Sequence, residues 1–250
     1  MQTLETVQQI RAWRHQVDAR VGFVPTMGAL HPGHLSLVRR AREECDQVIV
    51  SIFVNPTQFN DPSDLQRYPR PLEADLAFLR RAGVHTVFLP KAEEIYSDQF
   101  RFEIREKEIS RVLCGPRRPG HFEGVLTVVL KLFNLVRPTH AYFGEKDYQQ
   151  LLLIQQMVDA LFLDVNVVGC ATLREMDGLA MSSRNLLLTA DQRKKAPRLY
   201  QILTSAISKE EAARELAAEG FRVDYVEDHW GRRFAAVSLG SVRLIDNVPL

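Results

Sequence analysis

One stretch decides the fold of this 250-residue chain: Phe23-Val24-Pro25-Thr26-Met27-Gly28-Ala29-Leu30-His31-Pro32-Gly33-His34. The apolar run over 20–26 predicts a short buried strand, and apolar residues beyond the stretch recur at helical spacing. Pro32 fits the first turn of that helix, where its missing N–H is no loss. Gly28 and Gly33 allow a ligand to approach the backbone closely. The stretch therefore predicts a tight loop with free N–H groups at the positive end of a helix dipole, which suits phosphate.

The two histidines of this stretch, His31 and His34, are three positions apart, so they project on the same side of the first helical turn. Two imidazoles there could stabilise charge that develops on a transferring phosphoryl or nucleotidyl group. A His-x-x-His spacing by itself more often marks surface histidines or an adventitious metal site. Its position at a strand-to-helix turn with two glycines favours the phosphate interpretation.

Composition narrows the class of protein. A net charge of +1 argues against a nucleic-acid binder with a broad basic face, so an anionic ligand should be small. The three cysteines are odd in number and widely spaced, which is typical of reduced thiols in a cytoplasmic protein. Residues 1–20 form a charged, amphipathic stretch unlike a signal peptide. No apolar run reaches the ~20 residues of a membrane span. We therefore expect a soluble protein.

Strand-like and helix-like segments alternate through the first two thirds of the chain. The expected strands are 47–54, 84–89, 100–104, 139–143 and 165–168, and the expected helices are 72–82, 123–136 and 147–161. This alternation predicts an α/β fold with a Rossmann-like, doubly wound parallel sheet. Such sheets bind ligands at the carboxyl ends of their strands. The candidate functional loops fall at such ends: 27–34, 55–60 and 144–150.

The pattern changes near residue 175. Two helices are expected, over 189–200 and 209–220, followed by short antiparallel strands over 223–226, 234–238 and 242–245. We therefore expect a Rossmann-like domain over 1–174 and a smaller α+β C-terminal domain over 175–250, which could close over the first.

Two further motifs follow predicted strands. Gln58 lies in Asn55-Pro56-Thr57-Gln58, and its amide could bind both a hydroxyl and a carboxylate. In 143–150, Lys146 offers a charge for phosphate, Asp147 an acceptor for ribose hydroxyls, and Gln150 shares a helical face with Asp147. Taken singly, the first motif is more often a turn and the second a capped helix with a charged start.

Two more motifs lie in loops. The basic loop 114–124 contains Arg118 and His121, where a carboxylate or polyanion could approach, although a solvated linker would have the same composition. Residues 181–185 supply two hydroxyls and Arg184, which can hold triphosphate oxygens. Each motif is weak alone, and their compatible positions in the expected topology make them stronger together.

These motifs are similar to those of the pantothenate synthetase (pantoate–β-alanine ligase) family, within the nucleotidylyltransferase superfamily. The resemblance covers nearly the whole chain, through 25–34, 53–59, 67–70, 118–124, 144–150, 181–185 and 243–247. The segment between Tyr200 and Phe221 is shorter than is usual for that family.

The resemblance implies a two-step ligation that uses ATP. Pantoate would attack the α-phosphorus of ATP to give pantoyl adenylate and pyrophosphate, and β-alanine would then displace AMP to give pantothenate. Mg²⁺ is expected with the phosphates, with its protein ligands left open apart from Asp75 as a possible outer partner. A homodimer is usual in the family.

The resemblance also assigns residues. Gln58 and Gln150 would hold pantoate, and Gln58 would also reach β-alanine. His31, His34, Lys146 and Arg184 would offset phosphate charge, with His34 as the proton donor. The implied ATP site comprises Met27, Gly28, Ala29, Leu30, His31, Pro32, Gly33, His34, Gly144, Glu145, Lys146, Asp147, Leu173, Met181, Ser182, Ser183 and Arg184.

Three alternatives remain open. Another nucleotidylyltransferase could form a CDP- or ADP-linked product, but the amides of Gln58 and Gln150 suit a hydroxy acid better than a phosphorylated substrate. A small aminoacyl-tRNA synthetase relative is disfavoured by the near-neutral charge and the lack of an anticodon-binding extension. A nucleotide-sensing or scaffold protein would be expected to have lost one of the histidines, Lys146 or Arg184, and this chain keeps them all.

Overall fold

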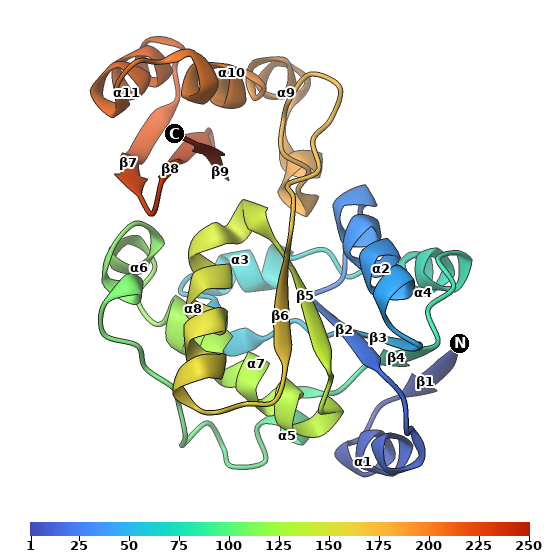
Figure 1. The fold of residues 1–250 in the computed structure, drawn as a ribbon. Coiled ribbons are helices and arrows are strands. Elements are labelled where there is room, and N and C mark those ends of the chain that lie inside the picture. The colour runs from blue at the N-terminus through green and yellow to red at the C-terminus, as the bar shows by residue number, and fades with distance from the viewer.

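A six-stranded parallel sheet forms the centre of the larger part of the molecule, in a computed structural model that describes all 250 residues (Figure 1). The strand order is β1-β4-β3-β2-β5-β6. The strands are β1 (Gln2–Leu4), β2 (Val21–Thr26), β3 (Gln47–Ile52), β4 (Thr86–Phe88), β5 (His140–Gly144) and β6 (Asn166–Cys170). The chain builds outward from β2 through β3 and β4, and then returns to place β5 on the other side of β2. This reversal is the switch point at which doubly wound sheets bind ligands.

Helices cover both faces of this sheet, as the sequence predicts. On one face α1 (Val7–Gln16), α7 (His121–Val136) and α8 (Tyr148–Ala160) pack in one apolar cluster, and on the other α2 (Pro32–Glu44) and α4 (Leu72–Arg81) pack in a second. Strands buried on both faces explain the continuous β-branched run of β3. None of the helices is both long and apolar enough to cross a membrane.

A second, three-stranded antiparallel sheet lies in the C-terminal part, above the first in Figure 1. It consists of β7 (Arg222–His229), β8 (Arg232–Leu239) and β9 (Val242–Pro249). The helices α10 (Arg198–Ser205) and α11 (Lys209–Ala218) pack against it around a separate apolar cluster. We refer to this part as the small domain and to the part with the parallel sheet as the large domain. The boundary at 174/175 stays a prediction.

Four local predictions differ from the structure. Residues 100–104 form no strand, and Phe100 and Phe102 are exposed, because no neighbouring strand lies there to pair with them. The helix expected over 189–200 is two helices, α9 (Ala190–Lys195) and α10, because Pro197 lacks the N–H that would continue the first. The short strand β1 was not expected. The loop after β3, expected to be irregular, contains a 3₁₀ turn, η1 (Pro56–Gln58), and α3 (Pro62–Arg67).

The remaining short elements connect these layers. They are α5 (Ala92–Ile95), α6 (Cys114–Arg117) and the 3₁₀ turns η2 (Ile109–Arg111), η3 (Glu145–Asp147) and η4 (Ser183–Leu187). The turn η3 lies between β5 and α8, and η4 follows a segment that leaves the end of β6. Both therefore lie at the carboxyl edge of the parallel sheet.

Candidate active site

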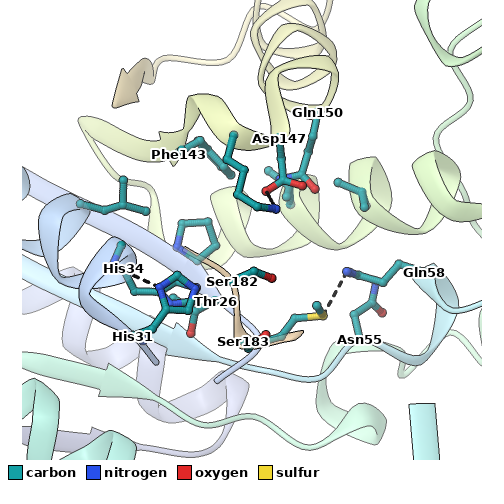
Figure 2. Close-up of a pocket in the computed structure, with 18 of the residues that line it drawn as sticks. Thr26, His31, His34, Asn55, Gln58, Phe143, Asp147, Gln150, Ser182 and Ser183 are labelled. Atoms are coloured by element: carbon teal, nitrogen blue, oxygen red, sulfur yellow. Dashed lines mark hydrogen bonds and ion pairs between the residues drawn. The ribbon is translucent and has the colours of Figure 1, made fainter. Parts of the chain in front are cut away.

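A cavity of about 260 Å³ opens at the carboxyl ends of β2 and β5. The predicted residues that line it come from five separate segments of the chain, and Figure 2 shows Gln58 across the cavity from the two histidines. They are Met27, His31, Gly33, His34, Gln58, Gly144, Lys146, Asp147, Gln150, Leu173, Met181, Ser182, Ser183 and Arg184, together with Arg118 and His121. Five residues of the predicted ATP site do not line it: Gly28, Ala29, Leu30, Pro32 and Glu145.

The loop after β2 does not offer the free N–H groups that the sequence predicts. Asp75 of α4 accepts hydrogen bonds from the backbone N–H groups of Ala29 and Leu30, each at 2.8 Å. The N–H of Gly28 donates to the hydroxyl of Thr26 at 3.2 Å. Asp75 is only 3% exposed and both of its oxygens are engaged, so it is not placed to be an outer partner of Mg²⁺. The carboxylate instead holds the loop.

The two histidines cap the helix that they begin. The Nδ1 of His31 accepts from the Gly33 N–H at 3.1 Å, and the Nδ1 of His34 accepts from the His31 N–H at 3.3 Å. A neutral imidazole that accepts at Nδ1 carries its proton at Nε2. Burial, and next the Lys146 charge, lower the pKa of His31 to about 4, and burial, and next His31, lower the pKa of His34 to about 3. Both rings are therefore neutral hydrogen-bond donors at pH 7.

Gln58 is oriented by Asn55, which the sequence identified only as part of the motif around Gln58. Asn55 is 1% exposed, and its Nδ2 donates to the Gln58 Oε1 and to the Gly124 carbonyl, both at 3.1 Å. The Tyr96 hydroxyl donates to the Asn55 Oδ1 at 2.6 Å. The Gln58 Nε2 is left at the cavity, 3.0 Å from the Met27 sulfur (Figure 2). Gln58 therefore presents a donor, which suits a ligand oxygen.

Arg118 adds positive charge beside Gln58, and His121 lies between the two residues. The His121 Nδ1 lies 2.9 Å from the Gln58 carbonyl oxygen and its Nε2 lies 2.9 Å from the Arg118 Nη1. Burial, and next Arg118, lower the pKa of His121 to about 3, so the ring is neutral. Burial lowers the pKa of Arg118 only to about 10. Arg118 therefore remains a cation whose hydrogen-bond partners here are neutral groups.

Lys146, Asp147 and Arg184 also line the cavity. The Lys146 Nζ lies 4.0 Å from the Asp147 carboxylate, and the Arg184 Nη2 donates to Asp64 of α3 at 3.1 Å. Asp147 occupies the N-cap position of α8, as predicted, but its side chain makes no capping hydrogen bond. Its carboxylate thus remains available to a ligand.

One carboxylate among the lining residues fits a Mg²⁺ ion that is held mainly by phosphates. That carboxylate is Asp147, which is half exposed. The structure contains no cluster of three or more His, Cys, Asp or Glu side chains that could bind a metal by itself. The residues present therefore suit an ion that arrives with a nucleotide.

A doubly wound parallel sheet with a polar cavity at its switch point, and paired histidines on the first turn of the next helix, defines a nucleotide-binding enzyme of Rossmann-like fold. Residues 1–249 match the family model described as Pantoate-beta-alanine ligase. The chain belongs to this family of ligases.

Individual relatives are similar to this chain along nearly their whole length. The chain is 54% identical to the pantothenate synthetase of Bdellovibrio bacteriovorus over 249 residues, covering 100% of this chain and 99% of that protein. A crystal structure of the ligase from Francisella tularensis, complexed with beta-gamma ATP and beta-alanine, has a TM-score of 0.96 at 43% identity and covers 100% of this chain and 97% of that one. A crystal structure of pantothenate synthetase from Thermus thermophilus has a TM-score of 0.94 at 45% identity, with coverage of 100% and 99%. Relatives of nearly equal length therefore exist, despite the short segment between Tyr200 and Phe221.

Proposed function

We propose that the chain joins pantoate to β-alanine at the expense of ATP, through a pantoyl adenylate, with release of pyrophosphate and AMP. Membership of the ligase family supports the overall reaction. The observation that carries the residue assignment is a single cavity lined both by cationic and N–H donors and by the amides of Gln58 and Gln150. Phosphates fit the cationic and N–H donors, and a hydroxy acid fits the amides.

In the first step a pantoate carboxylate oxygen bonds to the α-phosphorus of ATP, and the bond to the β-phosphate oxygen breaks. Negative charge grows on the pyrophosphate that leaves. Lys146 would offset it by charge, and the Nε2–H groups of His31 and His34 would donate hydrogen bonds to it without carrying charge themselves. Arg184 would exchange its partner Asp64 for a phosphate oxygen. Mg²⁺ would neutralise further phosphate charge when bound, beside Asp147.

In the second step the β-alanine nitrogen bonds to the activated carbonyl carbon, the bond to the AMP oxygen breaks, and the amine loses a proton. Gln58 is placed to serve both substrates because its amide N–H points into the cavity while Asn55 fixes its oxygen. Gln150 lines the same cavity and is the second proposed pantoate ligand. The unpaired cation of Arg118 would attract a substrate carboxylate at this end.

The test is ATP–pyrophosphate exchange with a panel of carboxylic acids, with and without β-alanine. We expect exchange with pantoate alone, and AMP release only after β-alanine is added. Exchange that requires β-alanine would exclude a free adenylate. A preference for another acid would overturn the substrate assignment while leaving the ligase family intact.

Three finer parts of the proposal concern Mg²⁺, assembly and location. Mg²⁺ is supported by the single lining carboxylate, Asp147. A cytoplasmic location is supported by three cysteines that all lie buried as free thiols. A homodimer follows from the family resemblance and is checked by sedimentation equilibrium.

A further inference from the structure

Two polar residues of the small domain, Asp246 and Asn247, lie buried in β9 although neither lines the cavity. Asp246 is 3% exposed and Asn247 is 2% exposed. Neighbouring side chains of a strand point to opposite faces, and these two contact different segments. Asn247 contacts the turn η3, and Asp246 contacts the segment that leaves β6. The proposed reaction gives neither of them a role.

The side chain of Asn247 holds the turn η3. Its Nδ2 donates to the carbonyl oxygen of Glu145 at 2.9 Å and to that of Lys146 at 3.0 Å. Its Oδ1 accepts from the Nε of Arg232. The orientation of the amide is unambiguous, because carbonyls only accept and a guanidinium only donates. Both amide hydrogens therefore fix the backbone from which Lys146 extends into the cavity.

Asp246 holds a second segment, the one that leaves β6 and lines the cavity at Leu173. Its carboxylate forms a bidentate pair with Arg174, at 2.6 and 2.9 Å. It also accepts from the backbone N–H of Asn247 at 2.8 Å. The Arg174 guanidinium stacks on the Tyr200 ring, 3.8 Å from its centroid. One dipeptide of the small domain thus connects two of the segments that line the cavity.

We infer that Asn247 is a positioning residue for Lys146, acting from the small domain. The inference rests on the proposed function, because it requires ATP phosphates beside Lys146. A lysine has a flexible side chain, so the place of its ammonium group depends on where its backbone is fixed. Misplacement of a reacting or binding group by about 1 Å can cost on the order of 100-fold in rate.

The experiment measures pantoate-dependent ATP–pyrophosphate exchange in Asn247→Ala and in Asn247→Asp, which keeps the side-chain shape but has no N–H to donate. We expect kcat to fall about 10- to 100-fold in both variants, with KM for pantoate changed by no more than about twofold. Asp228→Asn is the matched control, since Asp228 pairs with Arg233 inside the small domain at 2.9 Å. It should keep kcat even where it lowers the melting temperature.

A double-mutant cycle with Lys146→Met separates positioning from a general loss of structure. If Asn247 acts through Lys146, Asn247→Ala should cost less than about twofold once the lysine is gone. Full and independent losses in the double mutant would overturn the inference, as would unchanged kcat in both Asn247 variants. The wild-type arm tests the proposed function separately: no exchange with pantoate would reject that function, and the inference with it.

Discussion

Gly124→Ala would test whether the pantoate end of the cavity requires a residue without a Cβ at position 124. Gly124 lies in the first turn of α7, where η1 packs directly against it. A Cβ at this position would lie 2.6 Å from the backbone carbonyl of Thr57 and 2.7 Å from the Gln58 nitrogen, whereas ordinary contact begins at 3.4 Å. Both sides are backbone, so η1 and α7 must separate by about 0.8 Å.

The expected result is a selective loss of pantoate binding. Overpacking of this kind costs about 1–3 kcal/mol of stability, and the shift carries the Gln58 amide away from its substrate. Loss of one good polar contact raises KM for pantoate roughly 5- to 150-fold. KM for ATP should change by no more than about twofold, because the nucleotide end is built from other segments.

The assay is initial-rate kinetics with each substrate varied separately, beside urea unfolding. Val237→Ala is the control, since it removes a fully buried side chain from the small domain and destabilises without touching η1. A wild-type KM for pantoate in Gly124→Ala would refute the reasoning. An equal rise in KM for pantoate in Val237→Ala would show that the effect is global.

Three other perturbations test the remaining parts of the site. Gln150→Ala should weaken pantoate binding roughly 5- to 150-fold while ATP binding stays nearly intact. If calorimetry shows the reverse pattern, the assignment of the two subsites is wrong. His31 and His34 should titrate below pH 5 in an NMR experiment, because burial lowers their pKa values to about 4 and about 3; midpoints near 6.5 would contradict this. Since their folded pKa values lie below the unfolded value, stability should be complete above about pH 6.5 and fall as the pH drops toward 4, by at most about 1.4 kcal/mol per pH unit for each ring. Asp64→Asn frees Arg184 from a pair that is 31% and 38% exposed, so ATP should bind up to about 5-fold more tightly, and weaker binding would show that Asp64 supports the site.

The sequence predicted the sheet and the edge at which the cavity lies because those features depend on local patterns. The turn from β2 into α2 is encoded by adjacent residues, with Pro32 at the helix start and His31 as its cap. The parallel arrangement then brings Gln58 and Lys146 to the same edge, since both follow strands directly. Neither prediction required knowledge of long-range contacts.

What the sequence did not predict depends on partners far along the chain. Asp75 was predicted only as a possible outer partner of Mg²⁺. Only the fold brings it to the loop 45 and 46 residues away, where it accepts two backbone hydrogen bonds. The role of Asn55 depends on Tyr96 and Gly124 in the same way. A polar residue at the end of the apolar run 47–54 was the available signal for Asn55. For residues 100–104, a β-like composition misled because no strand edge lies beside them.

The carboxylate of Asp75 has a consequence for the thermodynamics of nucleotide binding. Ala29 adopts a positive φ of 51°, which a residue other than glycine would rarely hold in a free loop. Two hydrogen bonds that the loop donates to the buried carboxylate of Asp75 keep it in this shape before any nucleotide arrives. The entropic cost of ordering it is therefore met by folding, and little of the nucleotide's binding energy is lost in arranging the histidines. Nucleotide affinity therefore depends on the stability of the fold that holds this loop.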